Sequence, residues 1–269
     1  MTHWYEGPLA ALRLRATGPD AEEDRLVTAA VVVQDLAGAR PRVLRWLVSP
    51  GVTVTDEEAA RLGLTRDQVE RTGRWPAPVM EEVGRSLAAH TAAGRPLVVD
   101  DAPAALTLLD RELRRHRASS LGAYLAGVPL CVLDPRVLDT HLDRYRKGSR
   151  QLDALCVRYG VPAPPPHDAA EEARTAIEVV RALARVFAPR LQRLTPGELH
   201  ALQEDWHAAQ VRGEAARPAG SGPTRRGRCV RGRRRPSERT GNSRSGTTKS
   251  RSVDDGPALP GWAILGSNQ

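Results

Sequence analysis

The order of hydrophobic and polar residues near the start of the chain has the two-residue period of a β-strand. In residues 11–18, ALRLRATG, two leucines alternate with Arg13 and Arg15. Because successive side chains of a strand point to opposite faces, both leucines are predicted on one face and both arginines on the other. The face that carries the arginines is the first candidate for a functional surface.

Three short segments rich in valine and leucine follow one another, with turn residues between them. They are residues 9–15, 25–34 and 41–48. Short links between successive strands favour antiparallel pairing, so these segments predict an antiparallel meander. Two later apolar segments, residues 96–99 and 128–133, predict further strands, and the first of them has the two-sided apolar character of a buried parallel neighbour.

Helix signals fill the chain between and after these strands. Capping residues, terminal glycines and apolar residues at helical spacing predict helices over residues 56–63, 66–73, 78–93, 102–117, 134–145, 151–159, 168–186 and 195–212. The order of elements predicts an α/β fold. Its mixed five-stranded sheet has three antiparallel strands, then parallel additions, and is flanked by helices on both faces.

Residues 214–269 differ from the rest of the chain in charge. They contain 12 Lys and Arg against 4 Asp and Glu, so they carry the whole net charge of +8. With almost no large apolar residues they cannot bury a core, which predicts a disordered basic tail after a folded domain at residues 1–213. A solvated tail is the favoured interpretation. A nucleic-acid-binding arm and an out-of-frame end to the gene are the alternatives.

Nothing in the sequence indicates a membrane or secretory protein. There is no apolar run of transmembrane length, and the N-terminal residues lack the features of a signal peptide. The three cysteines, Cys131, Cys156 and Cys229, have no metal-type spacing. A cytoplasmic protein without a membrane partner is therefore expected.

Candidate catalytic and metal-binding residues are concentrated in the second half of the chain. Residues 167–173 read His-Asp-Ala-Ala-Glu-Glu-Ala at the start of a predicted helix. Upstream, Asp134 is followed by predicted helices and by the run Leu-x-x-Leu-Cys-x-x-Tyr-Gly at residues 152–160. Near the start of the chain, Thr17 and Gly18 form the turn that ends the first strand.

This arrangement resembles the ribonuclease-H-like 3′–5′ exonucleases of the DEDDh type, named for four acids and a histidine, among them the proofreading epsilon subunit of DNA polymerase III. Members carry Asp-x-Glu-x-Thr-Gly on the first strand, an Asn-x-x-Phe-Asp-type motif after the fourth, and His-x-Ala-x-x-Asp-Ala at the start of a late helix. The resemblance covers about residues 4–213 and is most specific in the second half. It implies a hydrolase in which four carboxylates hold two Mg²⁺ or Mn²⁺ ions and the histidine activates the attacking water.

Carried onto this sequence, the resemblance leaves the motifs incomplete. His167 falls at the general base and Glu172 at the last metal-ligand position. The two acids of the first motif fall at Arg13 and Arg15, and the acid of the second motif falls at Ala105. Because one of four ligands remains, the resemblance implies a degenerate centre with no metal cofactor and with the exonuclease activity lost.

Further positions near the implied cleft also depart from the family. The aromatic neighbour of the second-motif acid falls at Ala104, and a loop histidine of the family falls at Leu62. Asp100 and Asp101 end the fourth strand, and Asp101 stands in the place of the family's asparagine. Both are better placed to pair with arginines than to rebuild the near-octahedral site that Mg²⁺ requires.

The two arginines of the first strand have three interpretations. We expect Arg13 and Arg15 to be partly buried and paired with Glu172, Asp100 or Asp101. The plainer alternative is the solvent-facing side of an edge strand. In the third interpretation, the guanidinium groups stand in for the metals and hold a nucleic-acid phosphate without cutting it.

The implied partner is nucleic acid, a single strand with a 3′ end, and no protein partner is indicated. Expected contacts lie at Thr17 and in a basic loop. The basic residues of that loop are Arg144, Arg146, Lys147 and Arg150, and a solvated loop is an equal alternative.

Three functions remain open. The favoured one is an exonuclease-domain protein that acts on or binds single-stranded 3′ ends and has lost its catalytic activity. One alternative is an active metal-dependent 3′–5′ exonuclease with an altered Mg²⁺ or Mn²⁺ site. The other is a non-functional product of a decayed gene.

Overall fold

The computed structural model describes residues 3–215 of the 269-residue chain. By their internal contacts the described residues divide into two units, residues 3–209 and residues 210–215. The second unit is the end of one helix. The predicted tail at residues 214–269 therefore lies almost entirely outside the described residues, and its boundary with the domain stays a prediction.

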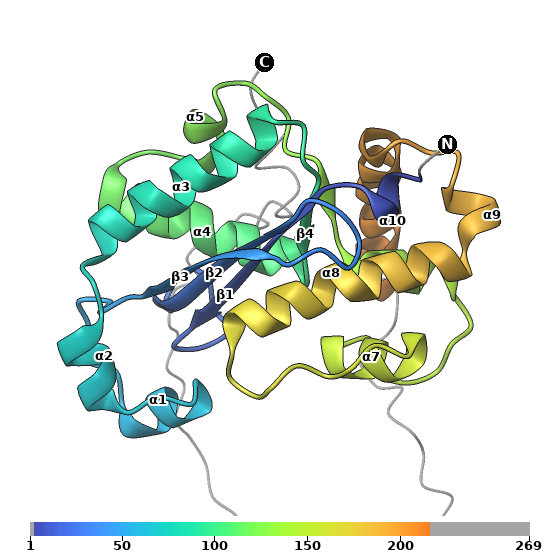
Figure 1. Cartoon of the computed structure of the whole chain (residues 1–269). Coiled ribbons are helices and arrows are strands. Elements are labelled where there is room, and N and C mark those ends of the chain that lie inside the picture. Colours follow the sequence, from blue (N-terminus) through green and yellow to red (C-terminus); the bar gives the residue numbers. More distant parts are fainter. Residues whose placement is uncertain (1–2, 216–269) are drawn as a thin grey trace, which may run out of the picture. The chain divides into compact units, whose positions relative to one another are not determined.

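Five strands form one mixed sheet in the order β3-β2-β1-β4-β5 (Figure 1). They are β1 (Leu9–Ala16), β2 (Leu26–Gln34), β3 (Arg42–Leu47), β4 (Leu97–Val99) and β5 (Val132–Leu133). The first three pair antiparallel, whereas β4 pairs parallel with β1 and β5 parallel with β4. The predicted fold class, an α/β mixed sheet with three antiparallel strands and parallel additions, is confirmed.

Helices pack on both faces of this sheet (Figure 1). One face is covered by α3 (Pro76–Ala92), α4 (Ala102–Arg117) and α5 (Leu121–Leu125). The other is covered by α6 (Pro135–Leu142), α7 (Leu152–Tyr159), α8 (Ala169–Val186), α9 (Ala188–Leu191) and α10 (Pro196–Ala215). A single 3₁₀ turn, η1 (Trp4–Glu6), precedes β1, and α1 (Asp56–Arg61) and α2 (Arg66–Thr72) enclose a small separate cluster.

Strand alternation determines what each face of β1 contacts. Leu12 and Leu14 are buried in the core beneath α3 and α4. Arg13 and Arg15 lie on the opposite face, where α8 crosses β1 and β2 and contributes Glu172. The predicted division of leucines and arginines between two faces is therefore confirmed.

One predicted strand is much shorter than expected. Of residues 128–133, only β5, Val132–Leu133, pairs with the sheet. Ala126 and Gly127 both have positive φ, and the chain turns there out of α5, so Val128 is left 42% exposed on the way back to the sheet. The sequence pattern did not predict η1, α5 or α9. The remaining elements begin and end within three residues of the predicted bounds.

The edge strand β5 is covered by a helix from the end of the chain. Gln203 of α10 accepts a hydrogen bond from the backbone N–H of Asp134 at 2.8 Å and donates one to the carbonyl of Val132 at 3.1 Å. Gln203 is completely buried. These bonds satisfy backbone groups that an uncovered edge would leave open to another strand.

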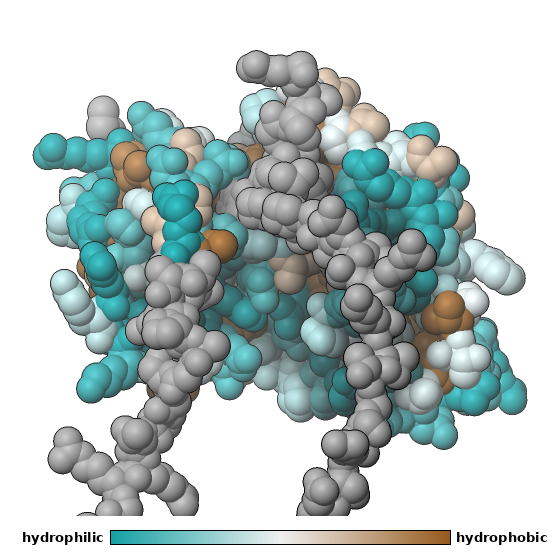
Figure 2. Space-filling model, turned by 180° about the vertical axis from the view of Figure 1, so that it is seen from behind, coloured by the Kyte–Doolittle hydropathy of each residue, from teal (hydrophilic) through white to brown (hydrophobic). Residues whose placement is uncertain are grey.

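The visible surface of the described residues in the view from behind is mostly hydrophilic, with separate small hydrophobic spots (Figure 2). Within residues 3–215, none of the helices has the length and apolar character needed to cross a membrane.

Candidate functional site

The candidate site forms where the parallel strands β1 and β4 run side by side. Leu12 pairs with Val99, so the next residues of the two strands, Arg13 and Asp100, meet at the same edge. Helix α8 begins over this edge because Asp168 caps it: its Oδ1 accepts the backbone N–H groups of Ala170 and Glu171. The cap places Glu172 in the first turn of α8, facing β1.

Two arginines of β1 share the carboxylate of Glu172. Arg13 Nε donates to Glu172 Oε2 at 2.7 Å, and Arg15 Nη1 donates to Glu172 Oε1 at 3.0 Å. Arg13 Nη1 also donates to Asp100 Oδ2 at 3.2 Å. The side chains of Arg13, Arg15 and Glu172 are 26%, 16% and 12% exposed, respectively. The expectation that both arginines are partly buried and paired with nearby acids is confirmed.

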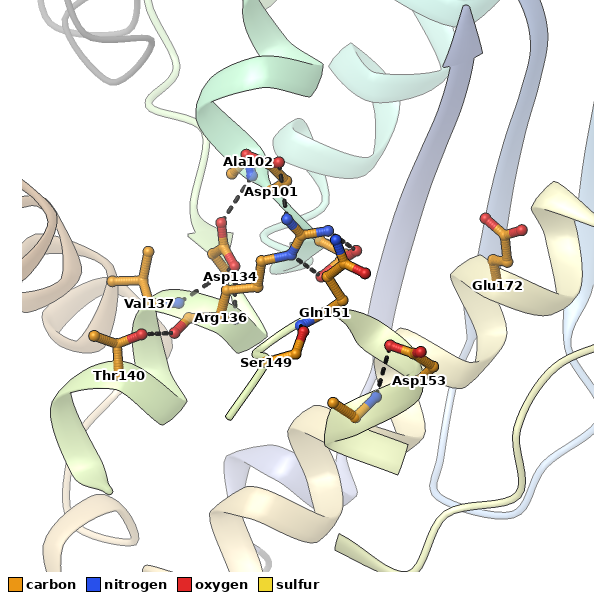
Figure 3. Close-up of polar contacts among 12 residues, drawn as sticks. Asp101, Ala102, Asp134, Arg136, Val137, Thr140, Ser149, Gln151, Asp153 and Glu172 are labelled. Atoms are coloured by element: carbon orange, nitrogen blue, oxygen red, sulfur yellow. Dashed lines mark hydrogen bonds and ion pairs between the residues drawn. The ribbon is translucent and has the colours of Figure 1, made fainter. Parts of the chain in front are cut away.

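A third guanidinium, that of Arg136 at the start of α6, completes the cluster. Its Nε and Nη2 bind the two oxygens of Asp100 at 2.8 and 2.9 Å, and its Nη1 binds Asp101 Oδ2 at 2.9 Å (Figure 3). Asp101 therefore pairs with Arg136 and not with the arginines of β1. The sequence analysis missed Arg136, although it directly follows Asp134 and Pro135 at the end of β5.

Behind this cluster, Asp134 joins the starts of two helices. Its Oδ2 accepts the backbone N–H of Ala102 in α4 at 2.7 Å, and its Oδ1 accepts that of Arg136 at 2.8 Å (Figure 3). Asp134 is 1% exposed, and burial raises the pKa of its carboxyl group to about 7, against the opposing effect of these hydrogen bonds. The residue positions Asp101 and Arg136 relative to each other.

The cluster does not fit a pair of divalent cations. Three guanidinium groups face three carboxylates, and both oxygens of Glu172 and of Asp100 already accept hydrogen bonds from arginines. Within the part of the chain that the structure describes, no three His, Cys, Asp or Glu side chains are grouped so that they could hold a metal ion. The side chains of Arg13 and Arg15 are cationic, and both lie against the carboxylate of Glu172.

His167 lies at the rim of the cluster, directly before the cap of α8. Its ring Nδ1 is 3.4 Å from Arg15 Nη2, and its backbone has φ 65°, a left-handed conformation that is strained for a residue with a Cβ. The side chain packs over Gly63, where an added Cβ would come within 2.5 Å of the His167 Cβ. The structure therefore places the ring of His167 beside Arg15.

The structure also shows where the remaining motif positions, Ala104, Ala105 and Leu62, lie. Ala105 and Ala104 line a pocket of 210 Å³ together with Arg13 and Asp100, so a longer side chain at residue 105 would face Arg13. Leu62 ends α1 and is buried in the small cluster between α1 and α2.

Thr17 is close to the site, but its hydroxyl group already has partners. Thr17 Oγ1 donates to Asp24 at 2.7 Å and accepts the backbone N–H of Arg25 at 3.1 Å. Its carbonyl accepts a hydrogen bond from Arg61 Nη2 at 3.2 Å. Thr17 therefore shapes the turn after β1, and the expected contact of its hydroxyl with nucleic acid stays a prediction.

The four basic residues of the loop between α6 and α7 divide into two pairs. Arg146 and Arg150 turn inward and form ion pairs with the buried carboxylate of Asp139, each at 2.9 Å. Arg144 and Lys147 are exposed and make no hydrogen bond or ion pair with the described residues. The structure therefore leaves two of the four predicted cations available to a partner.

A second pocket, of 370 Å³, lies on the other side of Arg13. It is lined by Arg13, Glu172 and Arg136 of the cluster and by Gln151 and Asp153 at the start of α7. Figure 3 shows Gln151 and Asp153 on the same side of the cluster as Arg136, with Glu172 on α8 facing the same space. Two guanidinium groups of the cluster, those of Arg13 and Arg136, thus line both pockets.

No model of a known protein family matches the chain, and no curated protein sequence matches it. Solved structures do match. Exonuclease I from Methylocaldum szegediense is 20% identical over 69% of this chain and 42% of its own, with a TM-score of 0.55. The nuclease domain of 3'hExo, a DEDDh family member bound to rAMP, is 14% identical over 71% of this chain and 96% of its own, with a TM-score of 0.55.

E. coli exonuclease I in complex with a dT13 oligonucleotide is 14% identical over 68% of this chain and 43% of its own, with a TM-score of 0.54. The matched region is thus less than half of each exonuclease I chain and nearly all of the 3'hExo nuclease domain. The chain has the fold of these exonucleases.

Proposed function

We propose that this chain is a member of the DEDDh exonuclease family that binds the 3′ region of single-stranded nucleic acid and does not cut it. The observation that carries the proposal is the shared pairing of Glu172 with Arg13 and Arg15, at 2.7 and 3.0 Å. The fold supports the descent, and the sequence motif at residues 167–173 supports the position of the site.

The charge of the cluster argues against two-metal chemistry. Two like charges about 4 Å apart repel by about 4 kcal/mol at an effective dielectric constant near 20. A divalent cation beside Glu172 would meet this repulsion from both arginines of β1. It would also have to displace two guanidinium groups from the one carboxylate that remains of the family's four.

The same arginines are suited to hold a phosphate group. Arg13 Nη2 and Arg15 Nε make no hydrogen bond with any described residue, and Arg13 borders both pockets of the site. Guanidinium groups bind phosphate oxygens through paired hydrogen bonds with a fixed planar geometry. We infer that a backbone phosphate binds Arg13 and Arg15 by sharing them with Glu172.

The ligands of the structural neighbours support single-stranded nucleic acid as the class of partner. E. coli exonuclease I holds a dT13 oligonucleotide, and 3'hExo holds rAMP. Another neighbour, 13% identical with a TM-score of 0.55, is a 3′-exonuclease that recognises the 3′ end of a histone mRNA stem-loop. These ligands include both DNA and RNA, so the binding experiment should use a DNA strand and an RNA strand.

A nuclease assay on a 3′-labelled single strand, with Mg²⁺ and with Mn²⁺, tests the absence of cutting. We expect the native chain to leave the strand intact, and a variant carrying Arg13→Asp, Arg15→Glu and Ala105→Asp to shorten it from the 3′ end. Shortening by the native chain that disappears in His167→Ala would contradict the proposal. That result would favour the second candidate function, an exonuclease with an altered metal site to which Asp100 or Asp101 contributes a ligand.

Fluorescence anisotropy of a labelled single strand tests the binding. Arg15→Gln should weaken binding and lower the slope of log K against log salt concentration by about 0.7, the effect of one lost phosphate contact on a single strand. Chelation of divalent cations should leave the affinity unchanged. Arg71→Gln, which removes an exposed ion pair within α2, is the matched control and should bind like the native chain. Equal slopes for both variants would contradict the role of Arg15.

A further inference from the structure

The loop between α6 and α7, residues 143–151, is organised around one buried carboxylate. Asp139 of α6 is completely buried and accepts a hydrogen bond from the Tyr159 hydroxyl at 2.7 Å. The same residue pairs with Arg146 and Arg150 from the loop, each at 2.9 Å. The carboxylate of Asp139 in α6 therefore binds two residues of the loop and one residue of α7, and so fixes the loop to both flanking helices.

Further contacts fix the two ends of this loop. Arg150 Nη2 donates to the carbonyl of Asp143 at 3.0 Å, which draws the end of the loop back to its beginning. The carboxylate of Asp143 pairs with Arg158 of α7 at 2.9 Å. Because the loop backbone is held in place before any ligand arrives, little conformational entropy remains to be lost when a partner binds.

The side chains that this framework turns outward are two cations and one aromatic ring. Tyr145 is 91% exposed, the largest exposure among the large hydrophobic side chains of residues 3–212. Arg144 and Lys147, on either side of it in the sequence, are exposed and have no ion-pair partner among the described residues. A ring flanked by two available positive charges combines the two elements of single-strand binding, a stacking surface and a cationic contact for the backbone.

The loop leads directly into the candidate site. It ends at Gln151, which lines the 370 Å³ pocket together with Arg13 and Glu172. Gln151 follows Tyr145 by six positions in the sequence, so the two Cα atoms lie at most about 21 Å apart. That distance is within the reach of the roughly 4–16 nucleotides that a single-strand groove accommodates.

We propose that Tyr145 is a stacking platform for a base of the single strand upstream of its 3′ end, with Arg144 and Lys147 binding the neighbouring phosphates. The inference rests on the proposed function, because the strand enters this loop from the pocket beside Arg13. Stacking is tolerant of sequence, since every base has an aromatic face, so the platform adds affinity with length and not with base identity. An acidic protein would bind Arg144 and Lys147, but its binding would not depend on the aromatic ring of Tyr145.

The test measures binding of the full-length chain to oligothymidylates of about four and about twelve nucleotides. Tyr145→Ala should bind the longer strand at least about fivefold more weakly than the native chain, and should bind the shorter strand equally well. Tyr145→Phe, which keeps the ring, should retain the native affinity. Trp75→Ala removes another exposed aromatic side chain, 75% exposed before α3, and should have no effect.

A longer strand in which the bases upstream of the 3′ region are replaced by abasic sites separates stacking from charge. The native chain should lose its advantage over Tyr145→Ala on this strand, whereas Arg144→Gln should still weaken binding. Equal affinities of the native chain and Tyr145→Ala for the intact longer strand would overturn this inference and leave the proposed function standing. Loss of binding in Tyr145→Ala with none in Arg15→Gln would instead overturn the role proposed for the β1 arginines.

Competition by polyglutamate distinguishes the other class of partner. We expect polyglutamate to compete weakly and with equal effect on the native chain and Tyr145→Ala. If polyglutamate displaces the strand as well as oligothymidylate does, and Tyr145→Phe and Tyr145→Ala bind alike, the loop is an acidic-protein site and the stacking inference is wrong.

Discussion

At the scale of single residues, Glu172 and Asp139 each pair with two arginines, but the two pairings have different roles. Asp139 is completely buried and also accepts a hydrogen bond from a hydroxyl group, whereas Glu172 is 12% exposed and lines the 370 Å³ pocket. A buried and fully paired carboxylate organises structure. A carboxylate that borders open space, and whose arginines retain unpaired N–H groups, can exchange its partners for those of a ligand.

Replacing Glu172 by glutamine should destabilise the fold. The neutral amide leaves the partly buried guanidinium of Arg15 without a counter-charge and that of Arg13 with Asp100 alone. We therefore expect a loss of about 1–3 kcal/mol in the free energy of unfolding, measured by urea denaturation. Glu171→Gln is the matched control, because Glu171 pairs with Arg174 alone, in an exposed i,i+3 contact within α8. That control should lose less than about 1 kcal/mol. Equal losses in the two variants would show that the β1 arginines do not depend on Glu172.

Asp134 should make the stability of the chain depend on pH. Burial raises its pKa to about 7 in the folded state, whereas the unfolded value is about 4. Between these values the folded state holds more protons than the unfolded state, so this residue's contribution to stability is fully present at low pH and falls as pH rises through about 7. Asp134→Asn lacks this titration.

Urea denaturation of the native chain and of Asp134→Asn at about pH 5 and about pH 8 measures that contribution. The stability of the native chain relative to the variant should be greater at the lower pH. Asp205→Asn, an exposed change in α10, controls for the general effect of removing one acid. A difference between native chain and Asp134→Asn that is independent of pH would be evidence against a raised pKa.

At the scale of secondary-structure elements, the sheet depends on α10 to close its short edge. β5 has two residues. Side chains of α10 bond the backbone groups at this edge: Gln203 bonds Asp134 N–H and the Val132 carbonyl, and His200 Nδ1 lies 3.3 Å from Val132 N. The edge is therefore protected by a helix that lies about 70 residues further along the chain, and the short β5 contributes little pairing of its own.

Gln203→Ala should leave the N–H of Asp134 and the carbonyl of Val132 without this partner in a buried place. We expect the free energy of unfolding to fall by about 2–4 kcal/mol, the combined effect of two lost hydrogen bonds and unsatisfied buried groups. Asp205→Ala, an exposed change in the same helix, should alter it by less than about 0.5 kcal/mol. If Gln203→Ala is as stable as the control, α10 does not secure the edge.

At the scale of the whole molecule, charge is unevenly divided along the chain. Residues 216–269 contain 12 Lys and Arg against 3 Asp and Glu, whereas residues 1–215 contain 28 and 29. The domain that holds the candidate site is therefore nearly neutral, and its binding must come from local arrangements such as the β1 arginines and the α6–α7 loop. Non-specific attraction of polyanions belongs to the basic segment.

A chain shortened to residues 1–215 should retain binding to single strands with a much weaker salt dependence than the full chain. The basic residues that are removed act by counterion release, which falls steeply with salt concentration, whereas stacking on Tyr145 does not depend on salt in this way. Anisotropy at several salt concentrations measures both slopes. Complete loss of binding in the shortened chain, with its fold intact by circular dichroism, would contradict the proposed function.

Local sequence patterns predict which side chains share a face and where most helices and strands begin. Alternation along β1 separated its leucines from its arginines, and Thr55, Thr65 and Asp168 marked helix starts, because strand periodicity and caps are local properties of neighbouring residues. The pairing of the β1 arginines with acids could also be predicted, since the likeness of the motifs to a known family implied which distant segments meet.

The partners of each charged group, in contrast, depend on how distant segments fold together. Arg13 and Glu172 are 159 residues apart, and nothing local predicts that Arg136 binds both Asp100 and Asp101, or that Arg146 and Arg150 face inward. The short β5 and the exposed Tyr145 also follow from packing between distant segments. Local sequence sets the direction of a side chain, whereas its burial and its partners depend on what the rest of the chain packs against it.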